Sequence, residues 1–333
     1  MKYEFEVLKV DDADAIFIRH YIDEKPYVIL IDAGNVCDSQ NIKNHLLNNY
    51  GSTIDLAICT HPDKDHKGGF FELLNDKSLT INEFWLTDPA HYLSSDDLIQ
   101  SSDKEKAIKA VQKIYNHPND ENLNLIQLAL SKCENVYSVV KGDKHELLPI
   151  TIIGPTSEYY QEVVKDMVKE YGVNTYEECD TEKYDEAAKV KEEDAKSVID
   201  EDDDPSPFNK SSLIILYEPV KGEHFVFAGD ATCASLTQVL LDYPYLRNID
   251  FLKVPHHGSK HNLNTTIIDS LSPKSCYISA KGTRKHPSPA IVSYLSKYGD
   301  VYSTHKSNSF IRRSRGISRN NTMSINPLKS KQK

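Results

Sequence analysis

The sequence lacks the usual features of a secreted or membrane-bound protein. No uninterrupted apolar run reaches the roughly 20 residues that a membrane-spanning helix needs. The opening segment, MKYEFEVLKVDDADAIFI, has no apolar core behind a basic head, as a signal peptide would have. The six cysteines are scattered without a Cys-x-x-Cys pair or framework spacing, which is typical of reduced thiols. These absences predict a cytoplasmic protein with no membrane segment.

Acidic residues outnumber basic ones, but one segment has no acidic residue at all. The formal net charge of -11 argues against a protein that binds nucleic acid over its whole surface. From 302 to 333, however, every charged residue is basic, so this segment either contacts a polyanion or is a solvated end. With 39% apolar residues among 333, the chain can bury a core as one large domain or two small ones.

The most informative stretch is 54–69, which reads IDLAICTHPDKDHKGG. Its β-branched, apolar beginning predicts a buried strand that ends at Thr60. In an extended loop His61, Asp63 and Asp65 point the same way, and His66 can swing in from the adjacent position. Two imidazoles and two carboxylates this close together predict a metal-binding loop rather than a solvated polar turn.

The segments before and after this loop read as an α/β pattern. Residues 3–32 alternate like a β-meander and end in Asp32-Ala33-Gly34. A helix is expected at 40–50, a second at 70–74, and a strand at 81–86.

Two insertions are expected in the chain. Residues 89–135 have helical periodicity and read as a helical piece, after which 147–154 is a strong strand. Residues 156–207 are rich in Asp, Glu and Lys, and we expect a mobile or partly helical acidic insertion there. An acidic flap that excludes or mimics polyanions near a phosphate site is a further hypothesis for this segment.

The second half repeats the pattern of strands that end in polar residues. The strand at 224–228 is followed by Gly229-Asp230, and the strand at 251–254 by Pro-His256-His257-Gly-Ser259. A further strand at 275–279 precedes His286 and a helix at 289–298. Two such modules facing each other suggest a two-sheet sandwich with helices outside.

These motifs resemble those of metallo-β-lactamase-fold hydrolases, whose signature is a His-x-His-x-Asp-His loop after a strand. Asp63 replaces the second histidine, and this variant is similar to the metallo-β-lactamase domain of ComEC-type DNA-uptake proteins, here in a stand-alone form. The resemblance implies an α/β fold of the four-layer αββα type over 1–310, with the helical and acidic insertions at 89–135 and 156–207. Residues 311–333 would then form a basic C-terminal tail.

The resemblance also implies a divalent metal centre with one or two ions. Asp230 matches the carboxylate that bridges two metals, His257 matches the last histidine ligand, and Asp32 would orient a metal-binding histidine. The second site would consist of Asp65, His66, Asp230 and His257. The first would consist of His61, Asp63 and Asn209, which stands where a third histidine is expected. Because that set is rich in oxygen, its preference shifts from Zn²⁺ towards Mn²⁺, and Mg²⁺ is an alternative.

Catalysis would use a water molecule that the metal activates. Asp65, His256 and His286 are the candidate catalytic residues, with His256 contacting a phosphate or protonating a leaving group. Ser259, Lys281 and Arg284 lie on neighbouring loops and are candidates for phosphate binding, although each could equally be a solvated surface residue.

The leading interpretation is a phosphodiesterase or nuclease that acts on DNA, with the basic tail contacting the backbone. A hydrolase of small esters, lactones or phosphorylcholine-type phosphodiesters is the alternative, and a non-catalytic metal-binding module for a partner is a third. A nuclease in the cytoplasm would need a restraining partner protein, which the sequence does not name. The oligomeric state is left open.

Overall fold

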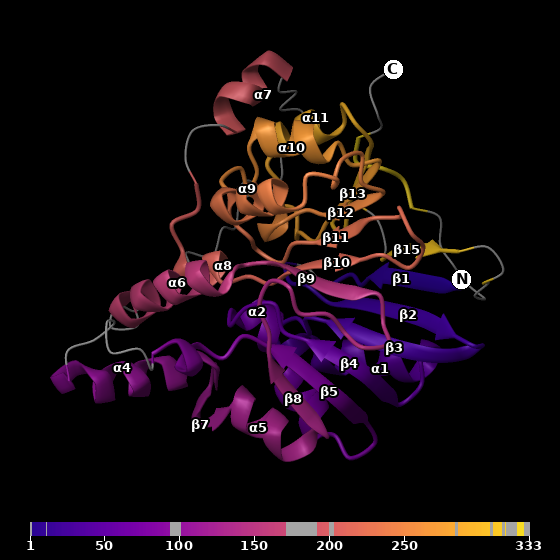
Figure 1. Cartoon of the computed structure of the whole chain (residues 1–333). Helices are drawn as coiled ribbons and strands as arrows, with labels where there is room; N and C mark the ends of the chain where they lie inside the picture. The colour runs from indigo at the N-terminus through magenta and orange to yellow at the C-terminus, as the bar shows by residue number, and fades with distance from the viewer. Residues whose placement is uncertain are drawn as a thin grey trace.

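The protein folds as two β-sheets packed face to face between helices, as the computed structural model shows (Figure 1). The structure describes residues 2–10, 12–93, 101–170, 192–199, 203–283, 286–306, 309–314, 317 and 325–329. Along the chain, the strands from β1 to β5 and β8 build most of one sheet, and those from β9 to β14 build the other.

The first sheet has the strand order β15-β1-β2-β3-β4-β5-β8. It opens with the antiparallel meander expected at 3–32 and continues with parallel strands from β3 to β8. Its strands are β1 (Tyr3–Val7), β2 (Ile16–Ile22), β3 (Lys25–Ile31), β4 (Thr53–Ile58), β5 (Thr80–Leu86), β8 (Asn135–Ser138) and β15 (Phe310–Arg313).

The second sheet has the strand order β14-β13-β12-β11-β10-β9. β9, β10 and β11 are antiparallel, whereas β11 to β14 run parallel. Its strands are β9 (Ile150–Gly154), β10 (Ile214–Tyr217), β11 (Phe225–Phe227), β12 (Phe251–Lys253), β13 (Ser275–Ile278) and β14 (Asp300–Ser303).

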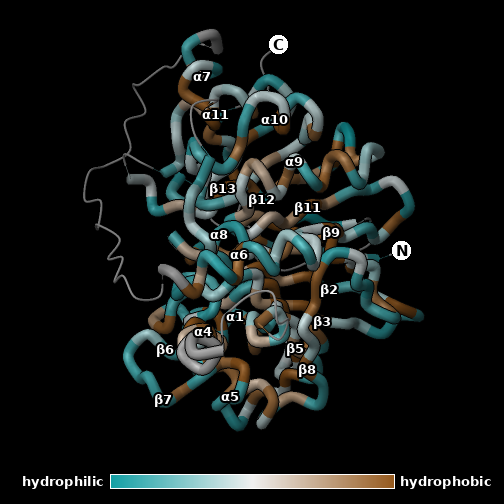
Figure 2. The backbone as a smooth tube through the Cα atoms, turned by 60° about the vertical axis from the view of Figure 1, so that its left-hand side comes forward, coloured by the Kyte–Doolittle hydropathy of each residue, from teal (hydrophilic) through white to brown (hydrophobic). Residues whose placement is uncertain are grey.

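Aromatic side chains fill the space between the two sheets. Phe5 of the first sheet is fully buried and lies 4.7 Å from Phe251 and 5.6 Å from Phe227 of the second, between ring centroids. Burying a phenylalanine side chain contributes about 1.5–3 kcal/mol, so this cluster is a main source of the attraction between the sheets. Figure 2 shows the central strands as largely hydrophobic and the peripheral loops as largely hydrophilic.

Helices cover the outer faces and complete four layers (Figure 1). Against the first sheet pack α1 (Ser39–Asn49), α3 (Phe70–Asn75), α4 (Ser101–Ile114), α5 (Leu125–Lys132) and α6 (Ser157–Glu170). Against the second pack α7 (Glu192–Ile199), α9 (Cys233–Asp242), α10 (Thr265–Leu271) and α11 (Pro289–Leu295). Short helical turns at η1 (Val36–Asp38), α2 (Lys64–Lys67), η2 (Pro89–Tyr92), α8 (Pro207–Lys210) and η3 (His256–Gly258) lie in connecting loops. The predicted α/β fold class with αββα layers is therefore confirmed.

The insertion predicted as helical at 89–135 also contains β-structure. Besides α4 and α5, it includes the antiparallel pair β6 (Asn116–His117) and β7 (Asp120–Asn124), and β8 begins at its last residue. β8 is an edge strand whose residues alternate between exposed and half-buried, so it has no apolar run that the sequence pattern could reveal.

The acidic insertion is described only in part. Its helices α6 and α7 are present, while 171–191 and 200–202 lie outside the described residues. Its end is not a solvated linker, because Asp203 accepts hydrogen bonds from the backbone N–H groups of Cys233 and Ala234 at the start of α9.

The predicted start of the basic tail at 311 falls inside β15, which pairs with β1. Arg312 donates to the carbonyl of Asp250 and stacks 4.9 Å from the Phe225 ring, and Arg313 lies 3.4 Å from a carboxylate oxygen of Glu4. These two arginines therefore serve the fold. Within the described part of the chain, no helix combines the length and apolar content needed to cross a membrane.

Candidate metal centre

The candidate site lies where strands of both sheets end. β3 and β4 of the first sheet are parallel, and so are β11, β12 and β13 of the second, so their carboxyl ends lie at a common edge. The N–H of Leu213 donates to the carbonyl of Thr60 at 2.9 Å and joins the two halves beside the site. This packing brings together residues that are almost 200 positions apart in the sequence, such as Asp65 and His257.

The loop after β4 is pressed against the end of β3. The N–H of Ala33 donates to the carbonyl of His66 at 2.8 Å. A Cβ atom on Gly69 would lie 2.0 Å from the carbonyl oxygen of Ala33, so only glycine fits there. The role of Gly69 is thus to allow close approach between two backbones, and it holds His66 against the strand that carries Asp32.

Asp32 orients the histidines of this loop. One of its carboxylate oxygens accepts from the backbone N–H of Thr60, and the other accepts from the Thr60 hydroxyl and from Nδ1 of His66, each at 2.7 Å. The Thr60 oxygen in turn lies 3.0 Å from Nδ1 of His61. Since the Thr60 hydrogen is directed to Asp32, Nδ1–H of His61 donates to Thr60. Both histidines therefore carry the proton on Nδ1 and leave the lone pair on Nε2.

His257 is held in the same tautomer by the other sheet. Its Nδ1 donates to the carbonyl of Ser279, after β13, at 2.8 Å. Its Nε2 lies 3.0 Å from a carboxylate oxygen of Asp65. The structure thus gives three buried imidazoles with engaged Nδ1 atoms: His61, His66 and His257.

Asp230 lies between the two groups of ligands. One of its oxygens, Oδ1, is 3.3 Å from Nε2 of His66, and the other, Oδ2, is 3.9 Å from Nε2 of His61. The ligand atoms of Asp65, His66, Asp230 and His257 all lie within 4.8 Å of one another. On the His61 side, Nε2 is 3.6 Å from Oδ2 of Asp63. Asp230 is therefore placed to serve two cations, one through each oxygen.

The donor atoms present fit a divalent cation. Nε2 of His61 and Nε2 of His66 are buried and have no hydrogen-bond partner, which is costly unless another group binds them. Burial disfavours the charged form of Asp230, but His66 and His256 outweigh it and hold the pKa of Asp230 well below its usual range. A bound cation would take the place of the Nε2 protons of these imidazoles, and a buried, ionised carboxylate beside imidazole nitrogens is a suitable ligand set for Mn²⁺ or Zn²⁺.

A second group of acceptors nearby has other partners. Asp14, Asp32 and His66 also offer ligand atoms within 4.8 Å of one another. However, Nζ of the buried Lys253 lies 2.6 Å from Asp14 and neutralises it, and the hydrogen bonds described above occupy Asp32. We therefore place the cations around Asp230 and assign this group a supporting role.

Asn209 lies in α8, where the resemblance places a third histidine. It is 4% exposed, and its Nδ2 donates to Asp204 at 2.7 Å. Its carbonyl oxygen Oδ1 has no hydrogen-bond partner. The side chain is therefore available as an oxygen ligand, although no contact with His61 or Asp63 places it in their ligand set.

His256 has neighbours that the sequence analysis did not identify. Its Nδ1 lies 2.9 Å from Asp204 and 3.0 Å from Oδ1 of Asn262, and its Nε2 lies 3.9 Å from Oδ2 of Asp230. Asp204 was hidden within the run of acidic residues at 200–204, and Asn262 is part of no motif. The Pro-Ser-Pro sequence that follows Asp204 is the one available signal, because it predicts a turn that fixes the chain.

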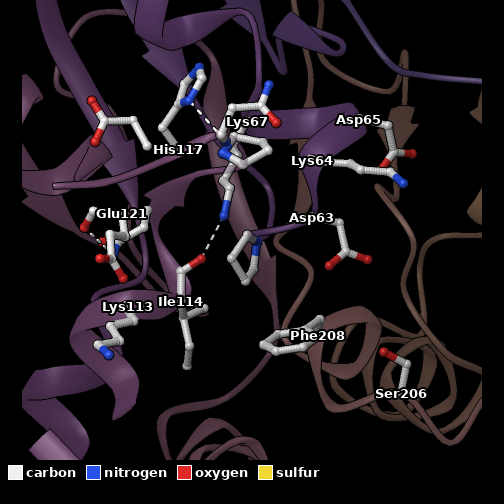
Figure 3. A pocket seen from close by; sticks show the side chains of 15 residues that line it. Asp63, Lys64, Asp65, Lys67, Lys113, Ile114, His117, Glu121, Ser206 and Phe208 are labelled. Atoms are coloured by element: carbon white, nitrogen blue, oxygen red, sulfur yellow. Dashed lines mark hydrogen bonds between the residues drawn. The ribbon is translucent and has the colours of Figure 1, made fainter. Parts of the chain in front are cut away.

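A cavity of about 640 Å³ opens beside Asp63 and Asp65 (Figure 3). Figure 3 shows Glu121 and Lys113 across the hollow from these residues, with Phe208 and Ser206 next to Asp63. Lys67, also in the wall, is held by the carbonyl of Ile114, to which its Nζ donates at 2.6 Å. His117 packs edge-on against Phe71 and lines the same cavity.

A second cavity of about 800 Å³ adjoins the centre at His256. His256, His286 and the buried Ser259 line it, together with Lys260. The rings of His256 and His286 are 5.4 Å apart between centroids. Lys281 is exposed and lines neither of these two cavities, and Arg284 lies outside the described residues. Of the candidate phosphate-binding residues, the structure thus places Ser259 beside the site.

Comparisons with known proteins give partial matches. No family model matches the chain. Over 97 residues the chain is 32% identical to ComE operon protein 3 of Bacillus subtilis (strain 168), which covers 28% of this chain and 12% of that protein. The chain thus corresponds to a small part of this relative's length.

Among solved structures, the chain is similar to a mutant of CmlA β-hydroxylase, with a TM-score of 0.48, 12% identity and coverage of 94% of this chain and 54% of the other. A subclass B3 metallo-β-lactamase from a soil metagenome library gives a TM-score of 0.36 at 13% identity, covering 89% of both chains. A diphosphatase of the PhnP family gives 0.36 at 10% identity, covering 83% of this chain and 85% of the other.

Proposed function

We propose that the protein is a metal-dependent hydrolase that cleaves phosphodiester bonds, most readily those of DNA. The observation that carries this proposal is the set of three histidines whose Nδ1 atoms are all engaged, so that each turns Nε2 towards the carboxylates of the centre. Fixing three tautomers in this way serves metal ligation.

The residues of the centre would have three roles: metal binding, positioning of the imidazoles and contact with the substrate phosphate. Divalent cations held by His61, Asp63, Asp65, His66, Asp230 and His257 would supply Lewis acidity and a water molecule that is acidic enough to act as a nucleophile. Asp32 and Ser279 hold the imidazoles in position. His286 and Ser259 line the adjoining cavity, where they can contact the phosphate of a substrate.

Two observations favour an extended substrate such as a nucleic acid. Two separate cavities adjoin the centre, one lined by Asp63 and Asp65 and the other by His256, so there is room for more of a substrate than the scissile group. The His-x-Asp-x-Asp-His loop, which resembles that of ComEC-type DNA-uptake proteins, supports the same choice. With Arg312 and Arg313 bound within the fold, backbone contacts would depend on other basic residues of the C-terminal segment.

The test is cleavage of linear and circular DNA, single- and double-stranded, by purified protein supplied with Mn²⁺, Mg²⁺ or Zn²⁺. The Asp65→Ala/His66→Ala double variant should lose the activity. His91→Ala, at an exposed histidine in η2, is the matched control and should keep it. DNA cleavage that persists in the double variant would show that this centre is not responsible.

A hydrolase of small esters, lactones or phosphodiesters is the second candidate. The volumes of the two cavities, about 640 and 800 Å³, fall within the range of small-molecule sites. Hydrolysis of bis(p-nitrophenyl) phosphate or a lactone by a protein that leaves DNA intact would favour this function. No hydrolysis of any substrate by the metal-loaded protein would favour a binding module.

A further inference from the structure

The first metal site has fewer protein ligands than the second unless another residue joins it. His61 and Asp63 face Oδ2 of Asp230 from one side. Asn209 stands in the place of the expected third histidine, and its Nδ2 donates to Asp204. With Oδ2 of Asp230 the first site has three protein ligands and the second has four, so an additional imidazole would complete a tetrahedral set at the first site.

His256 approaches the same oxygen of Asp230 as His61 does. Nε2 of His256 and Nε2 of His61 each lie 3.9 Å from Oδ2 of Asp230. Oδ1 of Asp230, by contrast, faces His66 at 3.3 Å. The two oxygens thus divide the surrounding imidazoles into two groups, and His256 belongs to the group of the first site.

Asp204 holds His256 in the same way as Asp32 holds His66. Nδ1 of His256 donates to Asp204 at 2.9 Å and to Oδ1 of Asn262 at 3.0 Å. Asn262 must present Oδ1 to the histidine, because its Nδ2 donates to Asp204 at 3.0 Å and to the carbonyl of Asp230 at 3.1 Å. Nδ2 of Asn209 also lies 3.3 Å from this nitrogen, but it donates to Asp204 at the shorter distance of 2.7 Å. The two acceptors therefore hold a proton on Nδ1, and Nε2, which faces Asp230, is the nitrogen that a cation can bind.

The backbone of the Pro-His-His-Gly segment directs its two imidazoles to different sites. His256 and His257 have φ values of 45° and 51°, a left-handed conformation that costs non-glycine residues about 1–3 kcal/mol each. As a result the two rings are inclined by 68°, with His257 facing Asp65 and His256 facing Asp204 and Asp230. The N–H of His256 also donates to Oδ1 of Asp230 at 3.2 Å, which fixes the carboxylate between them.

We propose that His256 is a ligand of the first cation through Nε2, together with His61, Asp63 and Asp230, and that Asp204 is its positioning residue. This inference rests on the proposed function, since it completes the same metal centre. It replaces an oxygen-rich first site by one with two imidazoles and two carboxylates. Such a set favours Mn²⁺ or Zn²⁺ over Mg²⁺, which binds imidazole poorly.

The experiment counts metal ions rather than turnover. Metal-stripped protein is dialysed to equilibrium against Mn²⁺ or Zn²⁺, and the bound metal is measured by mass spectrometry. We expect two ions in the unmodified chain and one in His256→Ala, while His286→Ala, at the neighbouring histidine of the same cavity, should still bind two. Asp204→Asn should weaken the first site by about 10–100-fold without abolishing it. Far-UV circular dichroism establishes that each variant is folded.

The outcomes separate this inference from the proposed function. If His256→Ala binds two ions as tightly as the unmodified chain, His256 is not a ligand, whereas the metal centre itself remains. If folded His256→Ala binds none, the assignment to the first site alone is overturned. An unmodified chain that binds no ion would contradict both the inference and the proposed function.

Discussion

Replacing Asp32 by asparagine should weaken both metal sites by changing the tautomers of two histidines. The variant has the same shape, and asparagine tolerates the left-handed φ of 57° found at this position. If its single oxygen keeps the bond to the N–H of Thr60, its NH₂ group then faces the Thr60 hydroxyl and Nδ1 of His66. Because an NH₂ group cannot accept, His66 would have to carry its proton on Nε2 instead.

The same substitution acts on His61 through Thr60. The hydroxyl would accept from the new NH₂ group and turn its hydrogen towards Nδ1 of His61, 3.0 Å away. His61 would then also carry its proton on Nε2, which is the atom needed for the metal. Changing a group that orients a ligand typically weakens metal binding about 10–100-fold, which corresponds to roughly 1.4–2.8 kcal/mol per site.

The assay is titration of metal-stripped protein with Mn²⁺ or Zn²⁺ in a calorimeter. Asp55→Asn is a matched control, because Asp55 lies on β4 and accepts from the N–H of Val28 at 2.8 Å, as part of the sheet and not of the metal loop. Equal affinities in Asp32→Asn, Asp55→Asn and the unmodified chain would refute the reasoning. If only one site is weakened, Asp32 does not act on His61 through Thr60. In that case Thr60→Val should leave the metal affinity unchanged as well.

Three further predictions concern the fold, the substrate and the pH. Phe5→Ala should lower the free energy of unfolding in urea by about 3–5 kcal/mol, since it empties the space between the sheets, whereas Leu241→Ala at an exposed position should change it little. DNA cleavage should fall steeply with salt, and Arg312→Ala should destabilise the protein by about 1 kcal/mol yet leave that salt dependence unchanged; a flat salt response would favour a small substrate. Burial beside Tyr217 lowers the pKa of His20 from 6.5 to about 4, so its contribution to stability is complete above pH 6.5 and is lost as the pH falls towards 4; His20→Phe should flatten this part of the curve of melting temperature against pH.

The central strands could be predicted from the sequence because they are buried on both faces. β4 and β12 are apolar runs that end at polar residues, and in a layered α/β protein such a pattern indicates a buried strand. β8 and the β6–β7 pair escaped prediction because they lie at an edge or on the surface, where burial imposes no periodicity. β15 was not predicted because its basic residues resemble those of a solvated tail. Their acidic partners, Glu4 and Asp250, are distant in the sequence.

The residues that bind metal could be proposed from local motifs, but those that orient them could not. His61 and His66 stand in one short loop, so their spacing alone suggests ligation. Asp204 is 52 positions from His256, and nothing in a run of aspartates distinguishes the one that becomes buried. The partner of His257 is the main-chain carbonyl of Ser279, a group that every residue has and that no sequence motif can indicate.

Three of the seven non-glycine residues with positive φ in the described part of the chain lie at the metal centre. Asp32, His256 and His257 all have positive φ values, and each would be more stable locally in another conformation. In this conformation Asp32 accepts three hydrogen bonds, and His256 contacts Asp204 and Asn262; these interactions would offset part of the cost. Because a cation around Asp230 would bind the resulting Nε2 atoms, metal binding should stabilise the folded chain, and removal of the metal should lower its melting temperature. The strain would then be a property that the fold tolerates because the metal centre requires it.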